Sequence, residues 1–206
     1  MSSRRFIFAA AVLALLSAGC AGSPERYSAP DFPAAVPGTV AVLPFDNESM
    51  SFQAQHVLRA LVSERLGALG YGVLPGAEVD EKLHALGLTD GGQLGAYAPE
   101  KLGAALETDG LMYGIVEEFT YQNVGFFRKR EVRLRLKLVH ASRGARLWEN
   151  VESESRVKVA LSKERAGRSF IEGIVEQAAE GMLHTALQDE ADRAVRRVLR
   201  NYPRRH

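Results

Sequence analysis

Residues 130–138 constrain the fold more than any other part of this chain, because charged and apolar residues alternate strictly along them. Successive side chains of a β-strand point to opposite faces, so four aliphatic residues line one face and charged residues the other. Residues 142–145 predict a turn, and residues 146–159 predict the returning strand. The segment therefore predicts an antiparallel hairpin whose apolar face packs against another layer.

The register of this hairpin decides which charges meet. A three-residue turn sets Arg135 against Val151, whereas an even-length turn opposes three pairs of unlike charge: Arg135 with Glu152, Arg133 with Glu154, and Glu131 with Arg156. Unlike charges across a strand pair stabilise it by roughly 0.2–1 kcal/mol each. We therefore predict the even register, which also places Trp148 opposite Val139 on the charged face.

Residues 39–75 predict a strand, a helix and a second strand. Residues 39–45 are apolar β-formers, residues 52–69 carry apolar side chains at helical spacing up to Gly70, and residues 71–75 form a brief second strand. This order predicts two parallel strands joined by a crossover helix.

Short helices are predicted over residues 78–85 and 99–106, and a long strand over residues 109–121. A helical pattern from residue 164 to about 199 is expected to bend at residues 188–190. The predicted fold class is α/β with an α+β tendency, a mixed sheet of about five strands with helices packed on it and a C-terminal helix.

The first twenty residues predict an export signal. A cationic start at residues 1–5 precedes an apolar run at 6–16, small residues at 17–19 and Cys20. The apolar run is shorter than the roughly 20 residues of a spanning helix. The arrangement resembles the lipobox of bacterial lipoproteins, although Ser17 stands where that pattern prefers leucine. The alternative is a secreted protein with an incidental cysteine near the cleavage point.

The lipobox reading divides the chain into four parts. Residues 1–19 are a signal peptide that is removed, and residues 20–37 are the acylated Cys20 and a proline-rich flexible tether. Residues 38–190 form the domain, and residues 191–206 form a basic helix end or tail. Because Ala21 follows the cysteine, resemblance to enterobacterial sorting implies the outer membrane, with the domain facing the periplasm or, alternatively, the cell surface.

Composition and motifs argue against several classes of function. Lys and Arg total 26 and Asp and Glu total 25, a balance that argues against nucleic-acid binding. A single cysteine excludes intramolecular disulfides and cysteine-built metal sites. The five histidines do not stand at metal-ligand spacing, and no nucleophile elbow or phosphate loop is present. We therefore predict neither an enzyme nor a metal or cofactor site.

Two sets of residues are candidate binding sites. Asp46, Asn47 and Glu48 follow the first strand, at the sheet edge where open α/β folds bind ligands, and suit a small polar ligand or a cation. Helix-cap chemistry is the alternative reading. Six arginines near the C-terminus suit an anionic partner such as lipopolysaccharide or phospholipid, or simply the negative end of a helix dipole: Arg193, Arg196, Arg197, Arg200, Arg204 and Arg205.

A resemblance to known families rests on an ordered set of motifs. Residues 39–49 resemble the opening strand of the TolB N-terminal domain, of CsgG and of LpoB-type synthase activators. The closer likeness is to small bacterial lipoproteins typified by a genome-derived neisserial surface antigen, and it runs from the lipobox to about residue 190. Its motifs are AVLP…NES at 41–49, GYGVLP at 70–75, GQL at 92–94, PEKLG at 99–103, KLV at 137–139 and LWE at 147–149.

The resemblance implies a non-catalytic binding module of the cell envelope, with no catalytic residues to carry over. The leading hypothesis is an accessory lipoprotein, anchored by Cys20 in the outer membrane, that binds protein partners in envelope biogenesis, secretion or transport. Alternatives are an LpoB-like activator of a peptidoglycan synthase and, less favoured, a CsgG-like oligomeric pore. A homodimer through an exposed strand or the C-terminal helix is also considered.

Overall fold

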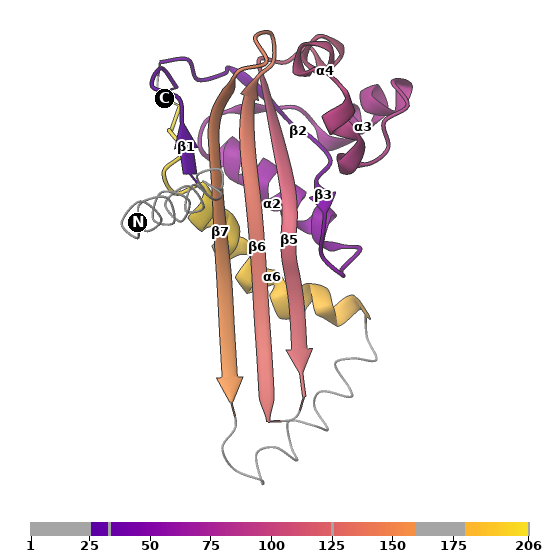
Figure 1. Cartoon of the computed structure of the whole chain (residues 1–206), viewed down its shortest axis with the longest axis vertical. Coiled ribbons are helices and arrows are strands. Elements are labelled where there is room, and N and C mark those ends of the chain that lie inside the picture. The colour runs from indigo at the N-terminus through magenta and orange to yellow at the C-terminus, as the bar shows by residue number, and fades with distance from the viewer. Residues whose placement is uncertain (1–25, 33, 125, 160–179, 206) are drawn as a thin grey trace, which may run out of the picture.

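The computed structural model describes residues 26–32, 34–124, 126–159 and 180–205, and one mixed sheet dominates it (Figure 1). The sheet order is β1-β7-β6-β5-β2-β4, and β3 pairs with β5 off this path. The strands are β1 (Arg26–Ser28), β2 (Thr39–Val42), β3 (Asp46–Asn47), β4 (Gly72–Val73), β5 (Gly110–Asn123), β6 (Phe127–His140) and β7 (Arg146–Val159). The helices are α2 (Ala54–Ala68), α3 (Gly76–Ala85), the 3-10 helix η1 (Gly91–Ala96), α4 (Pro99–Leu106) and α6 (Glu180–Val198).

The predicted fold class is confirmed, with seven strands in place of about five. The additional strands are two or three residues long, too short to show a hydrophobic period. β2 runs parallel to β4 and to β5, as the strand–helix–strand pattern predicts. Gly70 adopts φ +92°, a left-handed conformation that glycine reaches easily and that turns the chain from α2 into β4.

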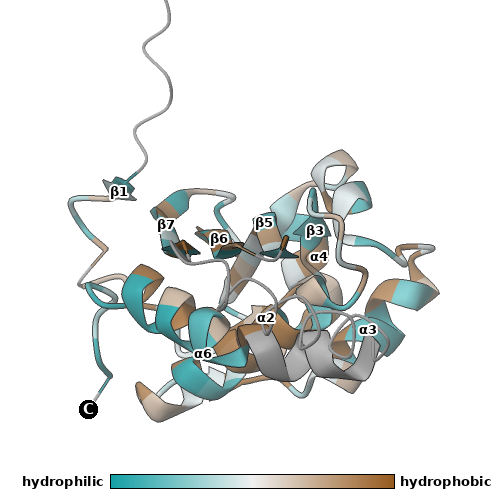
Figure 2. Ribbon diagram, turned by 90° about the horizontal axis from the view of Figure 1, so that it is seen from below, coloured by the Kyte–Doolittle hydropathy of each residue, from teal (hydrophilic) through white to brown (hydrophobic). Residues whose placement is uncertain are grey.

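Two hydrophobic clusters hold the sheet between helices. The larger one joins α2 and α6 to the apolar face of β5 and β6, where Leu134, Leu136 and Leu138 are fully buried. The smaller one joins α3, η1 and α4 to the opposite face near the start of β5. Figure 2, viewed along the strands, shows α2 and α6 on one side of β5, β6 and β7. The other side of β6 and β7 is the outer face, which no described helix covers.

The β6–β7 hairpin has an even-length loop, at residues 141–144 rather than the predicted 142–145, and a β-bulge changes its register further. The His140 N–H donates to the Ala145 carbonyl at 2.8 Å, which closes a four-residue loop. The bulge between Leu138 and Val139 then brings Trp148 opposite Leu138. Trp148 is therefore buried among the helices rather than placed on the charged face. An extra residue in one strand shifts all later pairs by one position.

The three predicted ion pairs between β6 and β7 are wrong for this reason. Arg135 opposes Val151, and Glu152 opposes Leu134. The shift moves the acidic residues of β7 to the helix-facing side, where other elements supply cations. Glu152 pairs with Arg26 of β1, and Glu154 forms ion pairs with Arg193 and Arg197 of α6.

The segment that the sequence places in a flexible tether is in large part folded. Residues 26–28 form β1 and pair with residues 148–150 of β7. Ala29 and Phe32 are buried in the larger hydrophobic cluster. The tether prediction is therefore wrong for these residues, because the edge of β7 and an aromatic cluster provide docking surfaces that local composition does not reveal. Cys20 and the signal segment lie outside the described residues.

The C-terminal residues are also part of the folded domain. α6 continues through residues 188–190 without a bend, and Val198 and Tyr202 are buried in the larger cluster. The Arg205 N–H donates to the Leu69 carbonyl at 2.9 Å. The predicted division at residue 190 therefore falls inside a packed helix. Part of the predicted 164–199 helix, residues 164–179, lies outside the described residues.

Candidate functional site

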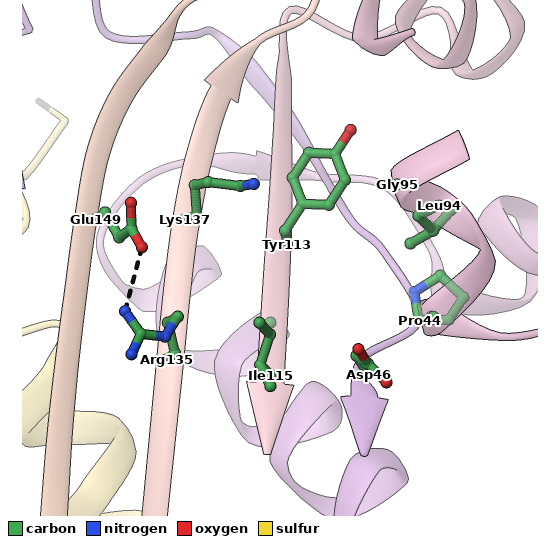
Figure 3. Close-up of a pocket in the computed structure, with 12 residues that line it drawn as sticks. Pro44, Asp46, Leu94, Gly95, Tyr113, Ile115, Arg135, Lys137 and Glu149 are labelled. Carbon is green, nitrogen blue, oxygen red and sulfur yellow. Dashed lines mark hydrogen bonds and ion pairs between the residues drawn. The ribbon is translucent and has the colours of Figure 1, made fainter. Parts of the chain in front are cut away.

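A pocket of about 240 Å³ lies on the outer face of the sheet, where the cover of helices ends (Figure 3). Its floor is formed by Tyr113 and Ile115 of β5. One wall comes from Pro44, Asp46 and η1, and the other from Arg135 and Lys137 of β6 with Glu149 of β7. Figure 3 shows these side chains arranged across three neighbouring strands.

Close backbone contact holds η1 against the entry to β3. A Cβ atom on Gly91 would lie 2.3 Å from the Phe45 carbonyl carbon, so only glycine fits at this distance. The Asp90 side chain accepts from the Gly92 N–H at 2.8 Å, and the Gln93 side chain accepts from the Asp90 N–H, which completes a capping box. These contacts therefore hold the glycine-rich segment in a fixed position as one wall of the pocket.

Gly91→Ala is expected to displace η1 and to lower the free energy of unfolding by about 1–3 kcal/mol, the usual cost of overpacking. The matched control is Gly95→Ala in the same helix, because a Cβ atom there meets no atom within 4 Å. That control should change stability by less than about 1 kcal/mol. Urea unfolding followed by circular dichroism measures both. Equal stabilities of the two variants would contradict the close contact.

The cationic wall of the pocket is tied to carboxylates on both neighbouring strands. Arg135 donates to Glu117 at 2.7 Å and to Glu149 at 3.3 Å. Glu149 is almost fully buried and also accepts from Arg146 at 2.8 Å. Glu117 reaches Arg135 because a bulge between Val116 and Glu118 turns it onto the outer face. Neighbouring residues of a regular strand point to opposite faces, but this bulge brings Glu117 and Glu118 to the same face.

Lys137 contributes a cation that stacks on an aromatic ring. Its ammonium nitrogen lies 4.9 Å from the centroid of the Tyr113 ring, within the range of a cation–π interaction. Burial, with a smaller effect of Glu100, raises the pKa of Tyr113 to about 12. The phenol therefore stays protonated at neutral pH and can donate a hydrogen bond to a ligand.

The structure separates the three residues of the predicted ligand edge. Asp46 lines the pocket and has no ion-pair partner among the described residues. Asn47 instead holds its own loop, because its side chain donates to the Ser51 carbonyl at 2.8 Å and accepts from the Ser49 hydroxyl at 2.7 Å. Glu48 is exposed and does not line the pocket. Only Asp46 therefore remains placed for ligand contact.

The six C-terminal arginines do not form one free patch. Arg193 and Arg197 pair with Glu154, at 3.3 and 3.0 Å. Arg196 pairs with Asp192, and Arg205 donates to the Pro37 carbonyl at 2.6 Å. The contacts of Arg193, Arg197 and Arg205 fasten α6 and the C-terminus to the rest of the domain, whereas the Arg196 pair lies within α6. Arg200 and Arg204 are exposed and form no ion pair with another described residue, and binding of an anionic partner there stays a prediction.

The composition of the pocket suits non-covalent binding of a ligand. Its floor is apolar, and its rim offers a carboxylate, a guanidinium, an ammonium and a phenol at separate positions. Such a mixture matches a polypeptide segment, which presents both apolar and charged side chains. Over the residues that the structure describes, no three His, Cys, Asp or Glu side chains are grouped to hold a metal, and no helix is long and apolar enough to cross a membrane.

Most of the residues that line this pocket were not predicted from the sequence. Arg135 and Lys137 were visible as charges of an alternating strand, but the even register assigned Arg135 to acids of β7. The glycines at 91, 92 and 95 were a detectable signal, since a cluster of glycines within a short segment often allows close backbone approach. Their partner, the backbone at residues 45–46, depends on tertiary structure.

The chain, a mixed sheet with helices packed on both faces, belongs to the GNA1162-like family of candidate lipoproteins, whose model matches residues 27–206. The family predicted from the motifs is thereby confirmed.

Several known proteins are similar to this chain. A candidate lipoprotein of Neisseria meningitidis serogroup B is 26% identical over 181 residues, which are 87% of this chain and 82% of the relative. The crystal structure of lipoprotein GNA1162 from Neisseria meningitidis is 25% identical, with a TM-score of 0.55, and covers 69% of this chain and 98% of its own. The PelC dodecamer of Paraburkholderia phytofirmans is 17% identical at a TM-score of 0.49, over 86% of this chain and 96% of its own. LpoB C-terminal domains are also similar, at TM-scores below 0.5.

Proposed function

We propose that this protein is an outer-membrane lipoprotein, acylated at Cys20, that binds a protein partner in envelope biogenesis or secretion. The pocket on the outer face carries this proposal, because it offers an apolar floor and separate charges without a cover of its own. Membership of a lipoprotein family supports the anchor. The domain faces the periplasm in this proposal, and its role is to hold a partner rather than to catalyse a reaction.

The pocket is suited to a protein ligand in two respects. Lys137 and Arg135 on one side and Asp46 on the other place opposite charges across an apolar floor, which favours one orientation of a bound segment. The supporting network of Arg135 with Glu117 and Glu149 keeps the wall in place before binding. A preformed wall lowers the entropy that association would otherwise cost.

Site-directed photo-crosslinking in cells tests the pocket. A photoreactive amino acid at Ile115, on the floor, is expected to capture a partner that mass spectrometry identifies. The matched control carries the same group at Ala60, an exposed position on α2 beyond the opposite face of the sheet. A partner captured at Ile115 and absent at Ala60 supports the proposal. The same products at both positions, or none at Ile115, would contradict it.

The identity of the captured partner separates the remaining alternatives. An outer-membrane or secretion component supports the accessory role, whereas a peptidoglycan synthase replaces it with the activator. Reach disfavours the activator, because Cys20 lies six residues before β1 and such a segment spans at most about 20 Å. Capture of a second copy in a discrete oligomer would replace the accessory role with self-assembly.

The anchor is tested independently of the partner. Metabolic labelling with an alkyne fatty acid should tag the natural chain and leave Cys20→Ala untagged, because the thiol is the acylation site. Membrane fractionation should move the Cys20→Ala chain out of the outer-membrane fraction. Labelling that persists in the variant would disprove acylation at Cys20.

A further inference from the structure

The strands β5, β6 and β7 extend beyond the rest of the sheet as a three-stranded arm. β2 and β3 pair with β5 only up to Val116, and β1 pairs with β7 only up to Asn150. Beyond these points the three strands continue together to Asn123, Phe127 and Val159. Figure 1 shows the arm projecting past α6, with its free end far from α3 and α4.

The end of the arm gathers apolar side chains that are exposed to solvent. Val124, Phe126, Val157 and Val159 form the arm tip and are each more than half exposed. They account for four of the seven large apolar side chains that are exposed in the described residues. Backbone hydrogen bonds close the turn, since the Val124 N–H donates to the Phe127 carbonyl at 2.8 Å. Val124 and Phe126 therefore project from a turn whose backbone groups are already hydrogen-bonded, and Val157 and Val159 project from the end of β7.

A cluster of four cations lies directly beside this tip. Arg128 stands opposite Lys158, and Arg130 stands opposite Arg156, so two cross-strand pairs carry like charge. The four side chains line a small cavity of about 40 Å³. Like charges directly opposite one another destabilise a strand pair, so this arrangement is unfavourable unless anions compensate it. We name these four residues the basic cluster.

The described part of the protein supplies only partial compensation. Glu190 of α6 lies 3.9 Å from Arg130 and 3.7 Å from Arg156. Arg128 and Lys158, the pair nearer the tip, have no carboxylate within ion-pair distance among the described residues. The cluster thus keeps unneutralised charge next to exposed apolar groups, which is the composition of a surface that meets anionic lipid.

The direction of β1 places the arm tip on the side of the anchor. β1 is antiparallel to β7, with Arg26 opposite Asn150, so its N-terminal end points toward the tip. Val159 lies nine residues beyond Asn150, about 30 Å along the strand. Six residues from Arg26 back to Cys20 reach up to about 20 Å in the same direction. Even with this segment fully extended, the tip lies about 10 Å beyond the level of Cys20, a depth that suits side chains entering the membrane interface. This step rests on the proposed acylation of Cys20.

We propose that the arm tip docks on the surface of an anionic phospholipid bilayer. The tip side chains enter the interface between headgroups and acyl chains, while the basic cluster binds lipid phosphates. Together with an acyl anchor, this contact would give the domain a defined orientation, with the arm directed at the membrane and the pocket on the flank of the sheet.

Vesicle flotation tests the contact without the anchor. The chain from residue 20 to 206 carrying Cys20→Ser is mixed with vesicles of phosphatidylcholine, with or without phosphatidylglycerol. We expect binding to the vesicles that contain phosphatidylglycerol, and weaker binding as salt is raised. Replacing Arg128 and Lys158 together with glutamine should weaken binding about 30-fold, because each cation near an anionic surface contributes about a fivefold to tenfold gain.

The apolar contribution has a matched control on the same chain. Replacing Val124 and Phe126 together with serine should weaken vesicle binding by more than about tenfold, since both apolar side chains lose their burial in lipid. Met50 and Phe52 are even more exposed but lie in the loop before α2, so replacing both with serine should leave binding unchanged. Circular dichroism confirms that each variant is folded.

The outcomes distinguish a bilayer surface from a free anion and from non-specific apolar adhesion. No binding, equal binding to neutral vesicles, or an equal loss in the control pair would overturn the proposal. Full competition by inorganic phosphate at low concentration would replace the bilayer with a free phosphate as the ligand. Because acylation is absent from this assay, failure here leaves the proposal for Cys20 standing, and failure of labelling at Cys20 leaves this one standing.

Discussion

Replacing Tyr202 with alanine is expected to lower the free energy of unfolding by about 3–5 kcal/mol, the range for large aromatic residues in cores. Tyr202 lies after α6 and is 3% exposed. Its ring packs against Phe32, Tyr71 and Trp148, at centroid distances of 5.6, 5.2 and 5.0 Å. The loss is a large part of the roughly 5–15 kcal/mol that stabilise a typical domain.

This result would show that four distant segments share one core. Urea unfolding, followed by circular dichroism and by the fluorescence of Trp148, measures the change. Tyr202→Phe keeps the three ring contacts and should retain most of the stability. Arg204→Ala alters an exposed residue two positions away and should change stability by no more than about 0.5 kcal/mol. If Tyr202→Ala were as mild as Arg204→Ala, the C-terminus would be a tail after all.

Glu190→Gln is expected to weaken the attachment of α6 to the arm. Glu190 is fully buried, and its carboxylate faces Arg193 at 3.0 Å, Arg156 at 3.7 Å and Arg130 at 3.9 Å. Removing its charge leaves three cations facing one another. Breaking a buried ion pair costs about 3–5 kcal/mol, but these arginines are partly exposed, so we expect about 2–3 kcal/mol.

A second carboxylate of the same helix provides the control. Asp192 forms an exposed pair with Arg196 at 2.7 Å, and Asp192→Asn should cost no more than about 0.5 kcal/mol. Urea unfolding compares the two variants at low and at high salt. Equal and small losses would mean that the buried carboxylate does not hold the arm to α6.

The sequence predicts the main hairpin well but not its register. Alternation over residues 130–138 identifies the strand, and the even-length turn is present at residues 141–144. The bulge at Leu138 is not signalled, because its benefit is the burial of both Leu147 and Trp148 in a core that other elements complete. Local charge pairing therefore selected the wrong partners; β1 supplied the partner of Glu152 and α6 those of Glu154.

In the candidate site, too, local sequence pattern indicates some positions and tertiary structure decides the others. Asp46 lines the pocket just beyond the end of a buried strand, a position that the strand–helix–strand pattern defines. Asn47 was a plausible ligand by type, but an asparagine just after a strand often bonds its own turn, as it does here. The opposite wall needs β5, β6 and β7 in register, so it could not be derived from local pattern.

The sequence by itself determined the elements that repeat a period or carry a motif: the alternating strand, the parallel strand pair around α2, and the family. These features depend on residues close together in the chain. Tertiary structure alone decided the register beyond the bulge, the packing of residues 26–32 and of the C-terminus, and the pocket. Each of these depends on contacts between residues far apart in sequence, whose energies outweigh local preference.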